Sequence, residues 1–212
     1  LQPRLSGASI GLMYSLIALG FVLVYKATDA INFAQGEFVM LAGMVVVTVL
    51  GMSAPLIAAI VAVLAVMIGF GFGLEKVVLR PLLGRPVVAV IMATIGVAAL
   101  LRGWGPLVLG IETRALPLPI GDDPISIGPA TLPPIQVLGA VVAVAFFLAF
   151  SWFFKKSRMG VAMRAVADNQ QVAQAMGINV ERYFALARAM AGIVSALGGI
   201  VWGSMLGVDV QL

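Results

Sequence analysis

Long apolar runs separated by short polar segments make up most of the chain. A helix needs about 20 apolar residues to cross the roughly 30 Å hydrocarbon core of a membrane, and most runs are close to that length. The run from Phe38 to Leu74 is too long for one helix, and Gly51-Met52-Ser53-Ala54-Pro55 divides it, because Pro is favourable in the first turn of a new helix. The pattern predicts an all-α polytopic membrane bundle of about six spans, forming a single domain over 1–212, with spans at 5–25, 33–50, 55–74, 87–101, 135–154 and 184–206.

The composition excludes a soluble protein. Hydrophobic residues make up 62% of the chain and charged residues 10%, against about 45–50% and about 25% in soluble domains. The chain contains no Cys and no His, which removes disulfides, thiolate and imidazole metal sites, and hydrolytic triads. It also lacks a Gly-Lys dipeptide, and with it any phosphate-binding loop for ATP. We therefore expect a membrane protein that is not itself an enzyme and uses no cofactor or metal.

The charged residues orient the spans. The net charge of +4 comes from 13 Lys and Arg against 9 Asp and Glu, and no basic face with interleaved aromatics indicates nucleic-acid binding. Segments 75–86 and 155–182 are rich in Lys and Arg, whereas 111–134 carries more acidic residues. Because Lys and Arg are enriched in cytoplasmic loops, we expect 75–86 and 155–182 on the cytoplasmic side of a bacterial or archaeal inner membrane, and 111–134 outside. Counting the spans back places residue 1 outside as well.

A polar cluster begins between the first two spans and continues into the second. Its members are Asn32, Gln35, Gly36 and Glu37. A carboxylate at the centre of a membrane helix costs about 2.5–3.5 kcal/mol on insertion scales, so such residues often mark transport paths. One interpretation is that these residues line a gate or an aqueous path. The other is that they cap and anchor the start of a helix, where a carboxylate is favoured by the helix dipole. Both interpretations remain open.

Small residues recur every four positions in two of the predicted spans. Residues with this spacing share one helix face, and in lipid they let helix backbones approach closely. We expect both series to pack helices together, with an interface that slides during transport as the alternative. The last span carries Ala191, Ser195, Gly199 and Gly203, and the first carries Gly7, Gly11 and Ser15.

The segment 155–182 is long for a connection between spans. Met163, Val166, Ala173 and Met176 alternate with polar residues between 161 and 176, which predicts one helix that ends at Gly177. A helix lying on the membrane would carry basic residues and large aromatics, whereas Gln and Asn predominate from 169 to 174. The composition favours contact with a protein partner.

Two parts of the chain together resemble one transporter family. Residues 11–25 read GLMYSLIALGFVLVY and 29–37 read DAINFAQGE, while 157–168 read SRMGVAMRAVAD and 173–178 read AQAMGI. In order, spacing and topology the chain is similar to the LivH-type permeases of branched-chain amino-acid ABC importers over nearly its whole length. That family is longer at its C-terminus, so the resemblance implies that the permease domain is incomplete there.

The resemblance also implies partners and a coupling site. Such permeases work with a second homologous permease, two ATP-hydrolysing subunits, a periplasmic or lipid-anchored substrate-binding protein and the surrounding membrane lipid. The segment 155–182 would then hold the coupling helix that fits a cleft in an ATPase. The family's E-A-A-x-x-x-G pattern keeps its spacing here but not its first two residues. The implied coupling residues are Gly160, Arg164, Asp168, Asn169, Gln171, Ala173 and Gly177.

The substrate and the driving force have alternatives. Relatives with this pattern import leucine, isoleucine and valine, whereas related systems carry urea or short amides. An intramembrane carboxylate is also typical of ion-coupled transport, so a secondary transporter or channel that uses Glu37 is a second hypothesis. A structural subunit without a pathway of its own is a third.

Overall fold

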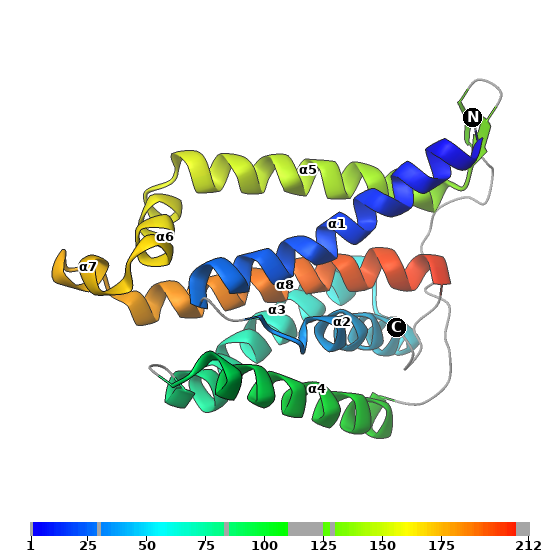
Figure 1. Cartoon of the computed structure of the whole chain (residues 1–212). Helices are drawn as coiled ribbons and strands as arrows, with labels where there is room; N and C mark the ends of the chain where they lie inside the picture. The colour runs from blue at the N-terminus through cyan, green and yellow to red at the C-terminus, as the bar shows by residue number, and fades with distance from the viewer. Residues whose placement is uncertain (1, 29–30, 83–84, 110–124, 128–129, 207–212) are drawn as a thin grey trace.

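The computed structural model describes residues 2–28, 31–82, 85–109, 125–127 and 130–206, and these form a helical bundle with one short hairpin (Figure 1). The elements in chain order are α1 Gln2–Thr28, α2 Gln35–Gly51, α3 Leu56–Leu74, the π-helical turn η1 Glu75–Leu79, the 3-10 turn η2 Arg80–Leu82, α4 Val87–Leu109, β1 Ile125–Ile127, β2 Ala130–Leu132, α5 Pro134–Lys156, α6 Arg158–Asp168, α7 Gln170–Ala175 and α8 Val180–Leu206.

Among the described residues, five helices are long and apolar enough to cross a membrane, one fewer than the sequence predicts. They are α1, α3 with its continuation to Leu82, α4, α5 and α8. The predicted span at 33–50 corresponds to α2, which has only 17 residues, or about 25 Å of helix. The predicted break is confirmed, since α2 ends at Gly51 and α3 begins at Leu56, directly after Pro55.

The structure differs from the prediction in two further features, the end of the fourth span and a short hairpin. The fourth span, expected to end near residue 101, continues as helix to Leu109, so Arg102 lies inside the helix rather than at its end. The antiparallel hairpin of β1 and β2 pairs Ile125 with Leu132 and adds a small β element to a fold predicted as all-α. Most of the acidic segment 111–134 lies outside the described residues.

Helix α8 lies at the centre of the bundle, where it packs against α1, α2 and α3. An apolar cluster on one side joins α2, α3 and α4 to α8, with Phe38, Met40 and Met67 among its buried members. A second cluster joins α1, α5, α6 and α7 to α8, with Leu16 and Phe184 among its members. The helix therefore connects two half-bundles, each with its own core.

The basic segments lie at the same end of the bundle, as the parity of the spans requires. Helices α6 and α7, the start of α8 and the end of α3 meet at this end, and the hairpin and the start of α1 lie at the other (Figure 1). Arg80 forms an ion pair with Glu181 at 3.3 Å, which ties η2 to the first turn of α8. We call the end that carries α6 and α7 the basic end.

Candidate translocation and coupling sites

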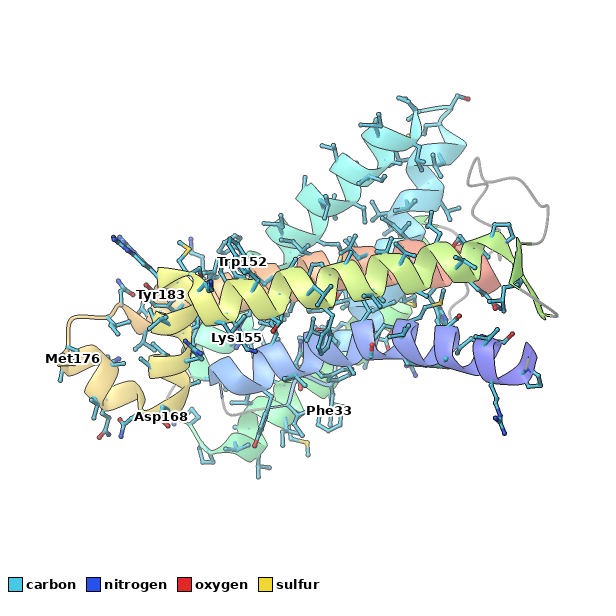
Figure 2. All side chains as sticks on the ribbon, turned by 90° about the horizontal axis from the view of Figure 1, so that it is seen from above. Phe33, Trp152, Lys155, Asp168, Met176 and Tyr183 are labelled. Carbon is cyan, nitrogen blue, oxygen red and sulfur yellow. The ribbon has the colours of Figure 1, made fainter. Side chains whose placement is uncertain are left out.

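The helix α2 begins inside the bundle. The backbone N–H of Phe33 donates to Thr94 Oγ1 at 3.3 Å, and Thr94 lies roughly two turns into α4. Asn32 is buried and folds the chain into the helix: its side-chain Oδ1 accepts from the N–H of Ala34 at 3.1 Å, and its carbonyl accepts from the N–H of Gln35 at 3.3 Å. Figure 2 shows Phe33 well inward from Met176 and Asp168 at the basic end. The chain thus re-enters the bundle before it becomes helical.

Gln35 connects this helix start to the centre of the bundle. Its side chain is fully buried, and Nε2 donates to Ser195 Oγ at 2.8 Å, roughly four turns into α8. Gly20 of α1 makes room for it, since a Cβ at that position would overlap the Gln35 amide. The other amide atom, Oε1, is buried without a hydrogen-bond partner among the described residues. Gln35 therefore brings an unsatisfied polar atom to the contact of three helices.

Glu37 forms an ion pair across to α4. Arg102 Nη2 donates to Glu37 Oε1, and the two side chains differ sharply in exposure, 5% for Glu37 and 62% for Arg102. The second carboxylate oxygen, Oε2, is buried with no partner in the described part of the chain. Arg102, which lies inside α4, is therefore the counter-ion of the one carboxylate within α2.

The four residues of the predicted polar cluster therefore have different surroundings. Asn32 shapes the turn before α2, but the N-cap position of the helix is Ala34, which makes no side-chain cap bond. Gln35 and Glu37 lie in the first turn of α2 but reach to α8 and α4, so their side chains do more than close a helix end. Gly36 is half-buried, and a Cβ there would meet nothing within 4 Å. Thr94 and Arg102 complete this set; Thr94 is not distinctive in the sequence, whereas Arg102 is the one charged residue of α4.

On α8 the small residues lie in helix contacts. Ala191 and Ser195 are fully buried, and Gly203 is buried. Gly199 lies close to α2: a Cβ there would stand 2.6 Å from the carbonyl oxygen of Val39 and 2.7 Å from the backbone nitrogen of Gly43. These atoms are backbone, so α2 and α8 can cross at this distance only with glycine at this position.

On α1 the face that was predicted to pack against other helices makes no such contact within the described part of this chain. Gly7 and Gly11 are exposed, and a Cβ at either would meet nothing within 4 Å. Ser15 is half-buried and donates to the carbonyl of Leu12 in its own helix. Buried Ser9 and Met13 are two residues further along, which is about 200° around a helix. The bundle therefore lies against the opposite face of α1.

The segment 155–182 forms two helices where one was predicted. Asn169 separates them, and its Oδ1 accepts from the N–H of Val172 at 3.0 Å, as an N-cap of α7. Ser157 caps α6 in the same way, accepting from the N–H of Gly160 at 2.8 Å. The predicted stop at Gly177 is confirmed by its φ of +82°. The chain then turns directly into α8.

The implied coupling residues divide into buried and exposed ones. Gly160 is buried, and a Cβ there would lie 2.5 Å from the carbonyl of Phe153, so it sets the turn from α5 to α6. Ala173 lies in α7 and is also buried. Neither Gly160 nor Ala173 can contact a partner subunit. The exposed ones are Arg164, Asp168, Asn169, Gln171 and Gly177. Two apolar residues that were not among the implied coupling residues are also exposed, Val172 by 57% and Met176 by 77%.

The described residues contain no group of Asp and Glu that could hold a metal ion. The comparison with known families is decisive instead, because the family described as the permease component of branched-chain amino acid transport systems matches residues 4–211. The chain belongs to this family. The permease is thus a multi-pass membrane protein of the ABC type, and a family of permease components agrees with the expectation that it is not itself an enzyme.

Named relatives align with almost the whole length of this chain. The high-affinity branched-chain amino acid transport permease LivH of Escherichia coli K12 is 29% identical over 98% of this chain and 72% of the relative, and BraD of Pseudomonas aeruginosa has the same identity and coverage. The autoinducer 2 import system permease LsrC of Yersinia pestis is 29% identical over 91% of this chain and 52% of the relative. No solved structure matches. The relatives are longer than this chain, as expected.

Replacing Gly177 by alanine is expected to destabilise the permease by about 1–2 kcal/mol, because a Cβ is unfavourable in the left-handed region. No neighbour lies within 4 Å of that Cβ, so the loss is due to the backbone alone. Thermal unfolding of the purified protein measures it. Gly177→Asn is the control, since Asn tolerates this conformation better; equal stability of the alanine variant and the wild type would contradict the strain.

Proposed function

We propose that this chain is the permease subunit of an ATP-driven importer of leucine, isoleucine and valine. It would form the translocation pathway with a second homologous permease, above two ATP-hydrolysing subunits, and receive substrate from a binding protein outside the membrane. The match of the permease-component family over 4–211 carries the proposal. The position of α6 and α7 at the basic end supports a cytoplasmic docking site there.

The first turn of α2 supports a gate. Gln35 and Glu37 are polar groups at the depth of the apolar spans, held by side chains of α8 and α4. Since α8 joins two half-bundles with separate cores, a shift of one half against the other would change the Gln35–Ser195 contact. ATP binding and substrate delivery would each favour one of the two arrangements, which is the condition for directed transport.

The surface of α7 supports docking to an ATPase. Val172 and Met176 are exposed apolar side chains beside the polar Gln171. An apolar group with a polar rim is typical of a protein interface, whereas a helix in the membrane surface would carry basic residues and large aromatics. The coupling function therefore rests on exposed residues of α7 and on Met176 directly after it, while the buried Gly160 and Ala173 fix the positions of α6 and α7.

The ion-coupled alternative fits the geometry less well. A proton or cation carried by Glu37 would have to bind a carboxylate whose charge Arg102 already balances through Oε1. The substrate is a separate question, since one relative with 29% identity is named for autoinducer 2 import. Urea and short amides remain alternative substrates, to be distinguished by the binding protein that stimulates ATP hydrolysis.

Replacing Val172 and Met176 together by aspartate is expected to reduce co-purification of the ATPase subunits about 30-fold, which corresponds to the roughly 2 kcal/mol of an interface hot spot. Carboxylates would have to lose their hydration in an apolar cleft, and the permease fold itself does not need either side chain buried. The measurement is the ratio of ATPase to permease recovered from membranes.

The matched control is Val161→Asp, an exposed valine of α6 at the same end of the bundle. It is expected to leave the ratio unchanged. Equal loss in both variants would contradict docking on α7. If the wild-type permease is recovered from membranes without ATPases and its uptake follows an ion gradient, the importer proposal is contradicted and ion-coupled transport through Glu37 is favoured.

A further inference from the structure

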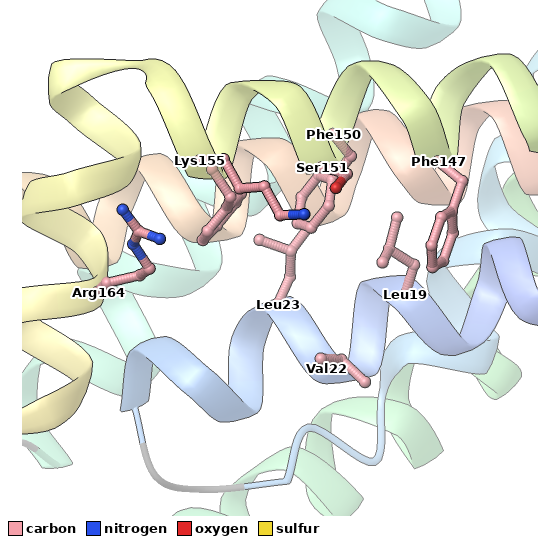
Figure 3. A pocket seen from close by; sticks show the side chains of 9 residues that line it. Leu19, Val22, Leu23, Phe147, Phe150, Ser151, Lys155 and Arg164 are labelled. Atoms are coloured by element: carbon pink, nitrogen blue, oxygen red, sulfur yellow. The ribbon is translucent and has the colours of Figure 1, made fainter.

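A groove of about 290 Å³ lies between α1, α5 and α6, close to the basic end (Figure 3). Its walls come from the last turns of α5 and from the facing side of α1. The apolar wall includes Leu19, Leu23, Phe147 and Phe150. Both α1 and α5 are long and apolar enough to cross a membrane, so this wall lies between two membrane-spanning segments.

Two cations close the groove toward the basic end. Lys155 lies in the last turn of α5 and Arg164 in the middle of α6, and both line the groove (Figure 3). Both side chains are exposed, and neither forms an ion pair with any carboxylate in the described part of the chain. Asp168, the nearest acidic residue along α6, is one turn further on. The groove thus has a long apolar part and a cationic end at the level of the membrane surface.

We propose that this groove binds one anionic phospholipid, with an acyl chain along the phenylalanine wall and the phosphate between Lys155 and Arg164. Basic pockets between spans on the cytoplasmic side are suited to anionic headgroups. A peptide segment is a poorer occupant, because its backbone polar groups would find few partners in this wall. The inference does not depend on the proposed function.

The position of Arg164 gives the lipid a structural effect. Helix α6 is joined to the bundle by the capped turn at Ser157 and by its buried residues Met163 and Val166. A phosphate held by Lys155 and Arg164 adds a link between α5 and the outer face of α6, which those contacts do not reach. Anionic lipid therefore fixes the angle at which α6 leaves the membrane.

The test uses the permease purified together with its partner subunits and placed in nanodiscs that contain either phosphatidylglycerol or phosphatidylcholine. Native mass spectrometry measures how much of each lipid the protein retains. Replacing Lys155 and Arg164 together by glutamine is expected to lower retention of phosphatidylglycerol about 25-fold, at about 5-fold for each cation near the membrane surface. The matched control replaces Lys156 and Arg158 together by glutamine; both are neighbouring exposed cations outside the groove. This variant should retain the lipid as the wild type does. Equal loss in both double variants would overturn the site, since it would show general attraction to the basic end.

A second variant tests the apolar part without a change in charge. Val22 lines the groove and is partly exposed, so tryptophan there fills the groove from outside and should also displace the lipid. The control is Val61→Trp, an exposed valine of α3 away from the groove. Retention of phosphatidylcholine equal to that of phosphatidylglycerol would overturn the headgroup assignment. A second permease subunit cross-linked into the groove would overturn the lipid as its occupant.

Discussion

Replacing Gly199 by alanine is expected to destabilise the permease by about 2–3 kcal/mol, the upper part of the range for overpacking. The new Cβ would lie 2.6–2.8 Å from Val39, Gly43 and Ala42, and the first two contacts are with backbone, which cannot turn away as a side chain can. The α2–α8 crossing would have to open, and with it the contact between Gln35 and Ser195. The free energy of unfolding in mixed detergent micelles measures the loss.

The matched control is Gly69→Ala in α3, where a Cβ meets nothing within 4 Å. Alanine there should be neutral or stabilising by up to about 1 kcal/mol, the difference in helix propensity. A Gly199→Ala protein as stable as the Gly69→Ala protein would show that α2 and α8 can separate without loss, and the close crossing would then have no structural importance.

Replacing Arg102 by glutamine is expected to abolish transport and to cost about 3 kcal/mol of stability, because it leaves a buried carboxylate without its counter-ion. Glu37→Gln is expected to be milder. Arg102 is 62% exposed and lies about two turns from the end of α4, so its long side chain can extend to the membrane surface. Uptake into proteoliposomes and thermal unfolding measure the two effects.

The double variant, with glutamine at both positions, is the control for this asymmetry. It removes the unpaired charge and should recover most of the stability lost in Arg102→Gln, so that the two substitutions are strongly non-additive. If the double variant is as unstable as Arg102→Gln alone, the loss is due to the packing of the arginine rather than to its charge. If its stability recovers but not its uptake, the pair serves transport and not only assembly.

The thickness of the bilayer sets the length of a spanning helix, and the positions of such helices could be predicted from the sequence alone. Each long apolar run became a helix near its predicted position, and the break at Gly51–Pro55 lies where the pattern put it. The start of α2 was different. Its depth is set by Thr94, Arg102 and Ser195, which are 61, 65 and 160 residues from their partners, and no local pattern contains that information.

The small-residue series show a second limit of sequence patterns. A repeat of four tells which residues share a helix face but not whether a neighbour lies on that face. In α8 helices pack on several sides, so almost any face is buried and the prediction coincides with the contacts. In α1 the bundle lies on the face of Met13, and Gly7 and Gly11 point elsewhere.

The coupling segment could have been predicted more closely. Its helical character and its end at Gly177 followed from composition, but the break at Asn169 was missed. Asparagine is among the most favoured N-cap residues, and this one lies between polar residues where no apolar periodicity continues. That signal was present in the sequence. The burial of Ala173 with Met163 and Val166 agrees with the apolar series of the sequence, whereas Met176, the last member of that series, is exposed.

The start of α2 inside the bundle also bears on the order in which the protein is made. Its polar first turn leaves the ribosome long before the residues that hold it, because Ser195 follows Gln35 by 160 positions. At about 5–20 residues per second, that interval is roughly 10–30 s. During it α2 is too short to cross the bilayer unaided, and Glu37 first gains its partner when α4 is complete. The last described helix therefore closes the bundle, and a nascent chain that stops before it leaves Gln35 without Ser195.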